Sequence, residues 1–125
     1  MESKVDANKR QTILLVGNDD ALSYLLGRFA EQSEYALSAV SSIPSAQIIT
    51  DIQPKAIIFL SMKHLEAAQS LVTDLTGIET PIIVCSAVAD EARARELDAD
   101  LCLLHPITYD NFQHALIAVG SRKHA

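Results

Sequence analysis

The sequence predicts an α/β domain in which helices cover both faces of a five-stranded parallel sheet. Short apolar runs alternate five times with segments of helical periodicity, and the connections between them are short. The third run, Ala-Ile-Ile-Phe-Leu at 56–60, follows a proline and contains no polar residue. Such a run is typical of a central strand that is buried on both faces. Right-handed crossovers between parallel strands then place helices on both sides of the sheet, in a doubly wound arrangement.

The five expected strands are short and mostly apolar. The first is closed by a polar turn at 17–20, and the second alternates only weakly, which suits a shorter edge strand. In an open α/β sheet, ligands bind just beyond the carboxyl ends of the strands, so the residues that follow each strand are the first candidates for a site. The strands are expected at 12–16, 35–40, 56–60, 81–85 and 101–104.

Five helices are expected between and after these strands. Asp20 is a suitable N-cap for the first helix, and either Ser42 or Ser45 can open the second. Gly77 stands where the third helix should end, and Thr108 can cap the last. The sequence therefore carries start or stop signals for four of the five helices.

Apolar residues at helical spacing identify the faces that should pack on the sheet. They are Leu22, Leu25, Leu26 and Phe29 in the first helix; Ile48, Ile49 and Ile52 in the second; Leu65, Ala68, Leu71, Val72 and Leu75 in the third; and Phe112, Leu116 and Val119 in the last, which runs from Tyr109 to about residue 119. The fourth helix, at 90–98, is charged and rich in alanine. With few large apolar groups, it is expected to be the least firmly anchored.

Length and composition indicate one globular domain. The chain has 125 residues, of which 49% are hydrophobic and 21% charged, enough to build a core. Residues 1–11 are polar and are expected to form a flexible leader, residues 12–120 the domain, and residues 121–125 a C-terminal tail or the start of a linker. Two cysteines could form one disulfide, but Cys85 and Cys102 lie inside apolar runs, so they are expected to be free thiols of a reducing compartment.

Charge and motifs exclude several classes of function. A net charge of −6 argues against nucleic acid as a partner, because phosphate contacts need clustered Lys and Arg. No apolar run approaches the ~20 residues that span a bilayer, and residues 1–11 lack a secretory core, so we expect no membrane association and a cytoplasmic location. No strand is followed by GxGxxG or GxxxxGK[ST], so no nucleotide or other cofactor is expected.

Over about residues 12–120, the chain resembles the receiver domain of two-component response regulators. The resemblance rests on the order and spacing of four motifs, which are TILLV before a polar turn, the proline that leads PKAIIFL, TPIIVCSA and DADLCLLHP. It implies a flavodoxin-like fold with strand order 2-1-3-4-5 and five helices. It also implies a part in two-component, or phosphorelay, signal transduction.

The resemblance places the family's phosphorylation site on residues that lack its chemistry. A working receiver carries the acceptor aspartate at the end of the third strand, and here that position is Leu60. The acidic pair that helps to hold Mg²⁺ corresponds to Gly17 and Asn18. Mg²⁺ prefers carboxylate oxygens, and Leu60 has no nucleophilic atom, so no metal and no phosphoryl acceptor are expected. Asp19 could make a weak cation contact, or it could simply serve the turn and the helix terminus.

Two further positions complete this comparison. Ser86 matches the Ser/Thr that contacts the phosphoryl oxygens, and it is the only residue that fits the family pattern. His105, before Pro106, replaces the family's lysine, and by the resemblance the bond between them is expected to be cis. Cys102 takes the place of the aromatic residue that changes rotamer on activation, so Ser86 and Cys102 occupy the switch positions. His105 could bind an anion or could be an ordinary loop residue.

We therefore interpret the chain as a degenerate receiver, or pseudo-receiver, that is not an enzyme and acts by phosphorylation-independent protein–protein interaction. The resemblance implies a protein partner (an output domain, a kinase or another signalling protein), or a second copy in a homodimer, at the face of the fourth helix, fifth strand and fifth helix. The alternative is a flavodoxin-like domain that binds a small ligand or cofactor through residues 17–20, Ser61 and Ser86. A third hypothesis, an enzyme, would rest on His64, His105 and Asp19, with Ser61 beside His64 as a conceivable nucleophile.

Overall fold

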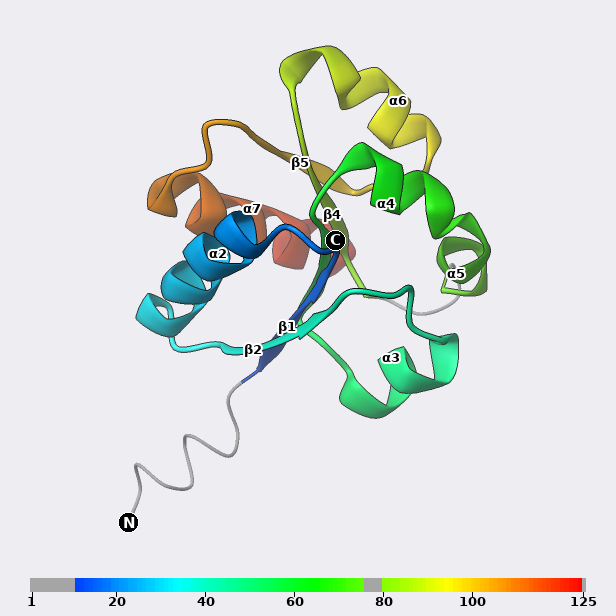
Figure 1. Cartoon of the computed structure of the whole chain (residues 1–125), viewed down its shortest axis with the longest axis horizontal. Helices are drawn as coiled ribbons and strands as arrows, with labels where there is room; N and C mark the ends of the chain where they lie inside the picture. Colours follow the sequence, from blue (N-terminus) through cyan, green and yellow to red (C-terminus); the bar gives the residue numbers. More distant parts are fainter. Residues whose placement is uncertain (1–10, 76–79, 125) are drawn as a thin grey trace.

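The structure, a computed structural model, describes residues 11–75 and 80–124 (Figure 1). Its five strands form one sheet in the order β2-β1-β3-β4-β5, with every neighbouring pair parallel, which confirms the predicted strand order. β3 lies at the centre, and β2 and β5 form the two edges. The strands are β1 (Thr12–Val16), β2 (Ala36–Val40), β3 (Ala56–Phe59), β4 (Ile82–Ser86) and β5 (Leu101–Leu104).

The described residues form six α-helices rather than the five predicted. The additional helix arises because the segment after β3 is interrupted at Ala68, which ends one short helix and precedes the next. A single 3-10 turn, η1 (Val88–Asp90), leads into the fourth predicted helix. The α-helices are α2 (Asp20–Gln32), α3 (Ala46–Ile52), α4 (Met62–Ala67), α5 (Gln69–Asp74), α6 (Glu91–Glu96) and α7 (Tyr109–His124).

The helices divide between the two faces of the sheet, so that the core has two layers. Figure 1 shows α2 and α7 together on one side, and α3, α4, α5 and α6 on the other. Because side chains alternate across a strand, β1 sends Ile13 and Leu15 toward α2 and α7, whereas Leu14 and Val16 belong to the opposite cluster. β3 is buried along its whole length, as the apolar run predicted.

The first helix starts one residue earlier than predicted. Asp19, not Asp20, is the N-cap, since its backbone is extended and its carboxylate accepts a hydrogen bond from the Leu22 N–H at 3.0 Å. Asp20 is instead the first helical residue, where a negative charge is favourable beside the positive end of the helix dipole. Both acids thus serve the start of α2.

Of the two serines that could open the second helix, Ser45 is the N-cap of α3, and its hydroxyl accepts from the Ile48 N–H at 3.3 Å. Ile49 is buried, but Ile48 is 46% exposed, so the prediction that Ile48 faces the core is wrong. Successive helical residues differ by about 100° around the axis, and in α3 only Ile49 is buried.

The helix predicted at 65–75 begins earlier, at Met62, because the Ser61 hydroxyl accepts the His64 N–H at 3.3 Å and caps it. The five apolar residues expected to face the core in this segment are all buried, which confirms that part of the prediction. Gly77, the expected end of the helix, lies outside the described residues.

The last helix begins as predicted. The Thr108 hydroxyl accepts from the Asn111 N–H at 3.1 Å, and Phe112, Leu116 and Val119 are buried. α7 then continues to residue 124, beyond the expected end near 119. Within the described ranges, no helix has the length and apolar character needed to cross a membrane.

Candidate functional site

Gly17 and Leu60 lie side by side at the carboxyl edge of the sheet, where open α/β sheets bind their ligands. Val16 of β1 is opposite Phe59 of β3, so the residues that follow these two strands are adjacent. The backbone fixes this register, since the Leu60 N–H donates to the Val16 carbonyl at 3.0 Å. The centre of the candidate site therefore consists of a glycine and a leucine.

The Leu60 side chain fills the space at this edge. It is 4% exposed and belongs to the core cluster beneath α2 and α7. A β-carbon placed on Gly17 would lie 2.8 Å from the Leu60 Cβ, closer than such atoms approach in proteins, and 3.0 Å from its Cγ, which is also a tight contact. Gly17 also has a φ of +150°, a conformation that only glycine adopts readily. Leu60 thus occupies the room that any side chain at position 17 would need.

The residues at this edge do not fit a magnesium site. Mg²⁺ takes octahedral oxygen ligands, but Leu60 has none and Gly17 has no side chain. Asn18 is exposed, and the Asp19 carboxylate already accepts the Leu22 N–H. Nowhere in residues 11–75 and 80–124 do three His, Cys, Asp or Glu side chains gather in a way that could hold a metal ion. A weak cation contact at Asp19 stays a prediction.

Ser86 ends β4 with a buried hydroxyl. The residue is 4% exposed, and its Oγ has no hydrogen-bond partner among the described residues. Its backbone is engaged, because the His105 N–H donates to the Ser86 carbonyl at 3.1 Å. A buried hydroxyl without a partner costs about 1–3 kcal/mol, and within residues 11–75 and 80–124 Ser86 is the only buried side chain in this situation.

His105 is exposed, and its bond to Pro106 is cis, as the resemblance implied. The five residues at which the resemblance places the family's phosphorylation site therefore differ in their exposure to solvent. The structure buries Gly17, Leu60 and Ser86 at the strand ends and leaves Asn18 and His105 in contact with solvent. Gly17 lies against Leu60, and His105 is joined to Ser86 by a backbone hydrogen bond.

Ser61 and His64 form a local pair in the first turn of α4. The Ser61 Oγ lies 2.7 Å from the His64 Nδ1, and it also accepts the backbone N–H of His64. Among the described residues no carboxylate hydrogen-bonds to this ring, and no bond or ion pair joins His64, His105 and Asp19. The pair therefore lacks the acid that would orient His64 as a base for a nucleophilic Ser61. The Ser61 hydroxyl instead serves as the N-cap of α4.

Both cysteines are free, as predicted. Cys85 is buried between the sheet and the α2/α7 layer, and this burial, with a smaller contribution from the charge of Asp19, raises the pKa of its thiol to about 12. Cys102 is half-buried and packs on the other face of the sheet. The two thiols therefore lie on opposite faces, and Cys85 is protonated and shielded at neutral pH.

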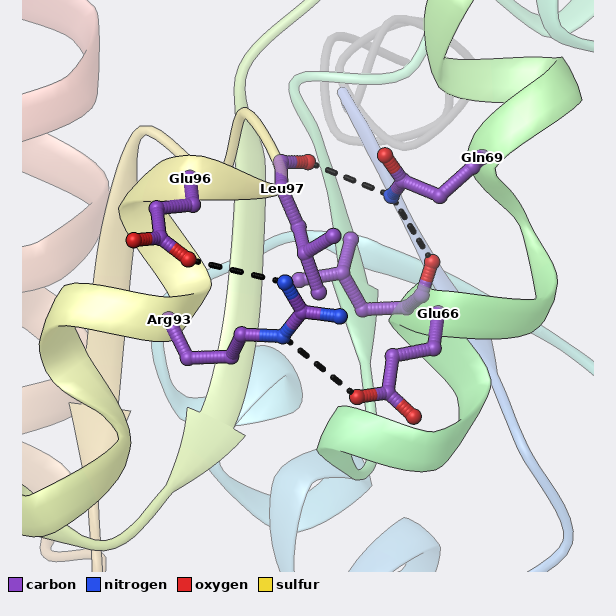
Figure 2. A network of polar contacts seen from close by, with 6 residues as sticks. Glu66, Gln69, Arg93, Glu96 and Leu97 are labelled. Atoms are coloured by element: carbon purple, nitrogen blue, oxygen red, sulfur yellow. Dashed lines mark hydrogen bonds and ion pairs between the residues drawn. The ribbon is translucent and has the colours of Figure 1, made fainter.

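Gln69 joins the α4/α5 segment to the end of α6 (Figure 2). Its Nε2 donates to the Leu65 carbonyl at 3.0 Å and to the Leu97 carbonyl at 3.2 Å. Leu97 is the C-cap residue of α6, so one amide group satisfies a carbonyl near the break after α4 and another at the end of α6. Both amide hydrogens are used.

Arg93 adds a second, weaker link in the same region (Figure 2). Its Nε lies 3.7 Å from Glu66 Oε2 and its Nη1 lies 3.5 Å from Glu96 Oε1, but these side chains are half exposed or more, so each pair contributes little. α6 buries only Ala94, and its cap Leu97 is buried beside it. α3 and α4 also bury one residue each, so the expectation that this helix is the least firmly anchored stays a prediction. Gln69 supplies a polar attachment that the sequence did not reveal.

The open edge of the sheet at β5 is flanked by two hollows. One of about 290 Å³ lies between β5 and α7, and another of about 80 Å³ lies between β5 and α6; Leu101 and Cys102 line both. Ala115, Ala118 and His114 form the α7 wall of the larger hollow. Neither hollow is lined by Gly17, Ser61 or Ser86, so the concave surface here belongs to the β5 face and not to the carboxyl edge.

No protein-family model and no curated protein sequence matches the chain. Solved structures do match it. A signal receiver domain of a response regulator from Bermanella marisrubri superimposes with a TM-score of 0.72 at 19% identity, over 89% of this chain and 98% of that one. A response regulator receiver domain from Clostridium thermocellum gives 0.69 at 16%, over 91% and 97%.

A third match is the N-terminal domain of the nisin resistance regulator NsrR, a lantibiotic response regulator. It superimposes with a TM-score of 0.68 at 24% identity and covers 87% of this chain and 97% of that one. Sequence identities this low establish a shared fold and nothing about function. The chain therefore has the flavodoxin-like fold of response regulator receiver domains.

Proposed function

We propose that the chain is a pseudo-receiver of two-component signalling, which acts through protein contacts and takes no phosphoryl group at the end of β3. The observation that carries the proposal is the packing of Leu60 against Gly17. By the resemblance, these two residues stand where a working receiver has its acceptor aspartate and one of its acidic pair. A hydrocarbon side chain offers no nucleophile, and its contact with position 17 leaves no room for an acid there.

The chemistry of phosphoryl transfer supports the same conclusion. Such transfer depends on positioning the phosphoryl group and on neutralising its charge with a metal ion or cationic groups. Asn18 is neutral, and Ser86 alone matches the family pattern. Its buried hydroxyl has no hydrogen-bond partner among the described residues. The protein is then not an enzyme, and no cofactor is needed.

The face formed by α6, β5 and α7 is the surface through which we propose that the protein meets its partner. β5 is an edge strand with hollows on both sides, so an opposing surface can insert apolar side chains beside Leu101 and Cys102. Charges of both signs border it, at Glu91 and Arg95 on α6 and at Asp100, and such charges set specificity more than affinity. An output domain, a kinase or a second copy of this chain would fit.

The net charge and the free thiols support a protein partner in the cytoplasm. A charge of −6 is unfavourable for a phosphate backbone, and two unpaired cysteines are typical of a reducing compartment. The alternative, a small ligand at the carboxyl edge, has no comparable support, because Leu60 fills that edge and neither hollow beside β5 includes it.

The first test asks whether the site accepts a phosphoryl group. The protein is incubated with acetyl phosphate and Mg²⁺, or with beryllofluoride and Mg²⁺, and followed by intact-protein mass spectrometry and amide NMR. A phosphorylatable receiver domain serves as the positive control. We expect no adduct and no shift at Ser86. A stable adduct, or a saturable Mg²⁺-dependent shift at Ser86, would overturn the proposal.

The second test concerns the partner face. Leu101→Asp places a charge between the two hollows, and Ile48→Asp places the same charge on the exposed side of α3 as a matched control. Sedimentation of the purified protein measures self-association, and crosslinking in cells measures other partners. We expect Leu101→Asp to abolish whichever association the wild-type protein shows and Ile48→Asp to leave it intact. If the two variants changed the association equally, the partner would not bind specifically at the β5 face, and this part of the proposal would be wrong.

A further inference from the structure

A third hollow, of about 330 Å³, lies between the end of α2 and the side of α7, away from the β5 face. Its walls are residues 32–35 on one side and Tyr109, Gln113, Leu116 and Ile117 on the other. The volume is at the lower end of the range for small-molecule sites. No lysine, arginine or histidine lines it, whereas hydroxyls, side-chain amides and one carboxylate do.

The end of α2 makes this hollow electrostatically negative. The Glu34 N–H donates to the Glu31 carbonyl and the Tyr35 N–H to the Ala30 carbonyl, which closes the helix with Glu34 in the left-handed conformation. A helix of 13 residues carries a partial negative charge at this end, and its last turn contains no basic residue. Glu34 lines the hollow and adds a carboxylate where a cation would normally be favoured. Glu31, in the last turn of α2, lies outside the lining, and its charge interacts with the Arg28 guanidinium.

The walls of the hollow are held in place by contacts of their own. The Ser33 hydroxyl donates to the Tyr109 hydroxyl at 3.2 Å, and the Tyr109 ring packs against Phe29 with centroids 5.6 Å apart. The Tyr35 hydroxyl is neutral at pH 7 and can accept a hydrogen bond, and partial burial raises its pKa further. Ile117, 66% exposed, extends the aliphatic wall to the surface.

From these features we propose that the hollow binds a small organic cation, an alkylammonium or guanidinium compound. Carboxylate, hydroxyl and amide oxygens would accept its N–H groups, tyrosine faces would favour its charge, and Leu116 and Ile117 would pack on its carbon chain. An anion has no cationic partner here. A bare metal ion is too small for the volume, and the described residues hold no cluster of ligands for one. The site is independent of the contact between Gly17 and Leu60.

An NMR titration with 1,4-diaminobutane tests the proposal, with 1,4-butanediol as an uncharged probe of the same length. We expect saturable amide shifts in residues 32–35 and 113–117 with a dissociation constant of about 1 mM or lower, since six heavy atoms can supply about 4 kcal/mol. The diol should cause no saturable shift. A response to both probes, or to neither, overturns the proposal.

Variants separate a specific site from general attraction to a negatively charged protein. Glu34→Gln should weaken diamine binding roughly two- to fivefold, and Gln113→Glu should strengthen it by a similar factor, as expected for partly exposed charge pairs. Asp74→Asn removes the same charge from the opposite face of the sheet and should change nothing. If Asp74→Asn weakens binding as much as Glu34→Gln, or if Gln113→Glu has no effect, the diamine is attracted only by net charge and the proposal is wrong.

Discussion

A β-carbon on Gly17 would lie 2.8 Å from the Cβ of Leu60, so the residue types at these two positions depend on each other. The contact follows from the register of β1 and β3, which brings the two strand ends together. Leu60 is buried because no side chain at 17 displaces it, and position 17 must remain glycine while Leu60 is present. At Leu60, the carboxyl edge of the sheet is therefore part of the hydrophobic core.

Gly17→Ala should lower the free energy of unfolding by about 2–4 kcal/mol, since it combines a strained φ with an overpacked contact to Leu60. Urea unfolding followed by circular dichroism measures the loss. Gly27→Ala is the matched control, because Gly27 is a helical residue of α2 whose added β-carbon would meet only Leu37 Cδ2 at 3.5 Å. The control should be neutral or stabilising by up to about 1 kcal/mol.

A double-mutant cycle separates the two causes. Leu60→Ala alone should cost about 2–4 kcal/mol through the cavity it leaves. If the contact is real, Gly17→Ala combined with Leu60→Ala should cost clearly less than the sum of the single changes. Strict additivity would show that Gly17 is required for its backbone conformation alone.

The strand order followed from the resemblance to receiver domains. Most of the core could be predicted from the sequence itself, since uniformly apolar runs and helical spacing report burial directly. The apolar run at 56–60, which forms β3 and Leu60 after it, is buried along its whole length, as expected. Prediction failed where two neighbouring residues competed for one role. Asp19 and Asp20 can both cap a helix, and Ile48 and Ile49 can both face a core, so only the geometry of the chain decides between them.

The candidate site was harder to predict than the fold. The resemblance to receiver domains located Gly17 and Leu60 but could not show that their atoms are in contact. That contact depends on how two strands 43 positions apart in the chain align. Nothing in the sequence marked Gln69, which reads as an ordinary polar residue of a helix. Its second acceptor, the Leu97 carbonyl, is 28 residues away and carries no side-chain signal.

Ser86→Ala should leave stability unchanged or raise it by about 1 kcal/mol, because it removes a buried hydroxyl that has no hydrogen-bond partner. Ser61→Ala is the comparison, since that hydroxyl caps α4 and bonds to His64, and its loss should cost about 1 kcal/mol. Thermal unfolding of both variants is the measurement. A clear loss of stability in Ser86→Ala would indicate a partner for the hydroxyl, such as a buried water or a bound ligand.

Cys85 should make stability fall as the pH rises above 9. Its thiol has an ordinary pKa of 9.0 in the unfolded chain and one of about 12 in the folded protein, where burial disfavours the thiolate. Between these values the unfolded state releases a proton that the folded state keeps, so the free energy of unfolding decreases by about 1.4 kcal/mol per pH unit. Urea unfolding at several pH values measures the slope, and Cys85→Ala should remove this contribution.

The two thiols should also differ in reactivity. Cys102, half-buried at the β5 edge, should react with iodoacetamide well before Cys85, as the alkylated peptides identified by mass spectrometry will show. Equal labelling of the native protein would mean that Cys85 is far more accessible than its burial indicates, and the predicted pH slope would then disappear as well.

Gln69→Glu should release α6 from the α4/α5 segment. The variant keeps the shape of the side chain but loses both donors, and it places a carboxylate against the Leu65 and Leu97 carbonyls. Losing two hydrogen bonds in a half-buried position should cost about 1–3 kcal/mol. Because the apolar anchors of α6 are few, amide hydrogen exchange should accelerate in α6 more than in α2 or α7.

Gln32→Glu on the exposed end of α2 introduces the same charge with no described hydrogen bond to lose, so it should leave exchange in α6 at the wild-type rate. Arg93→Gln breaks only exposed ion pairs and should change stability by less than about 1 kcal/mol. A ranking in which Arg93→Gln loosened α6 more than Gln69→Glu would mean that charge, rather than the buried amide, holds this helix. If Gln69→Glu also weakens partner binding without contacting the partner, then the orientation of α6 is what the partner recognises.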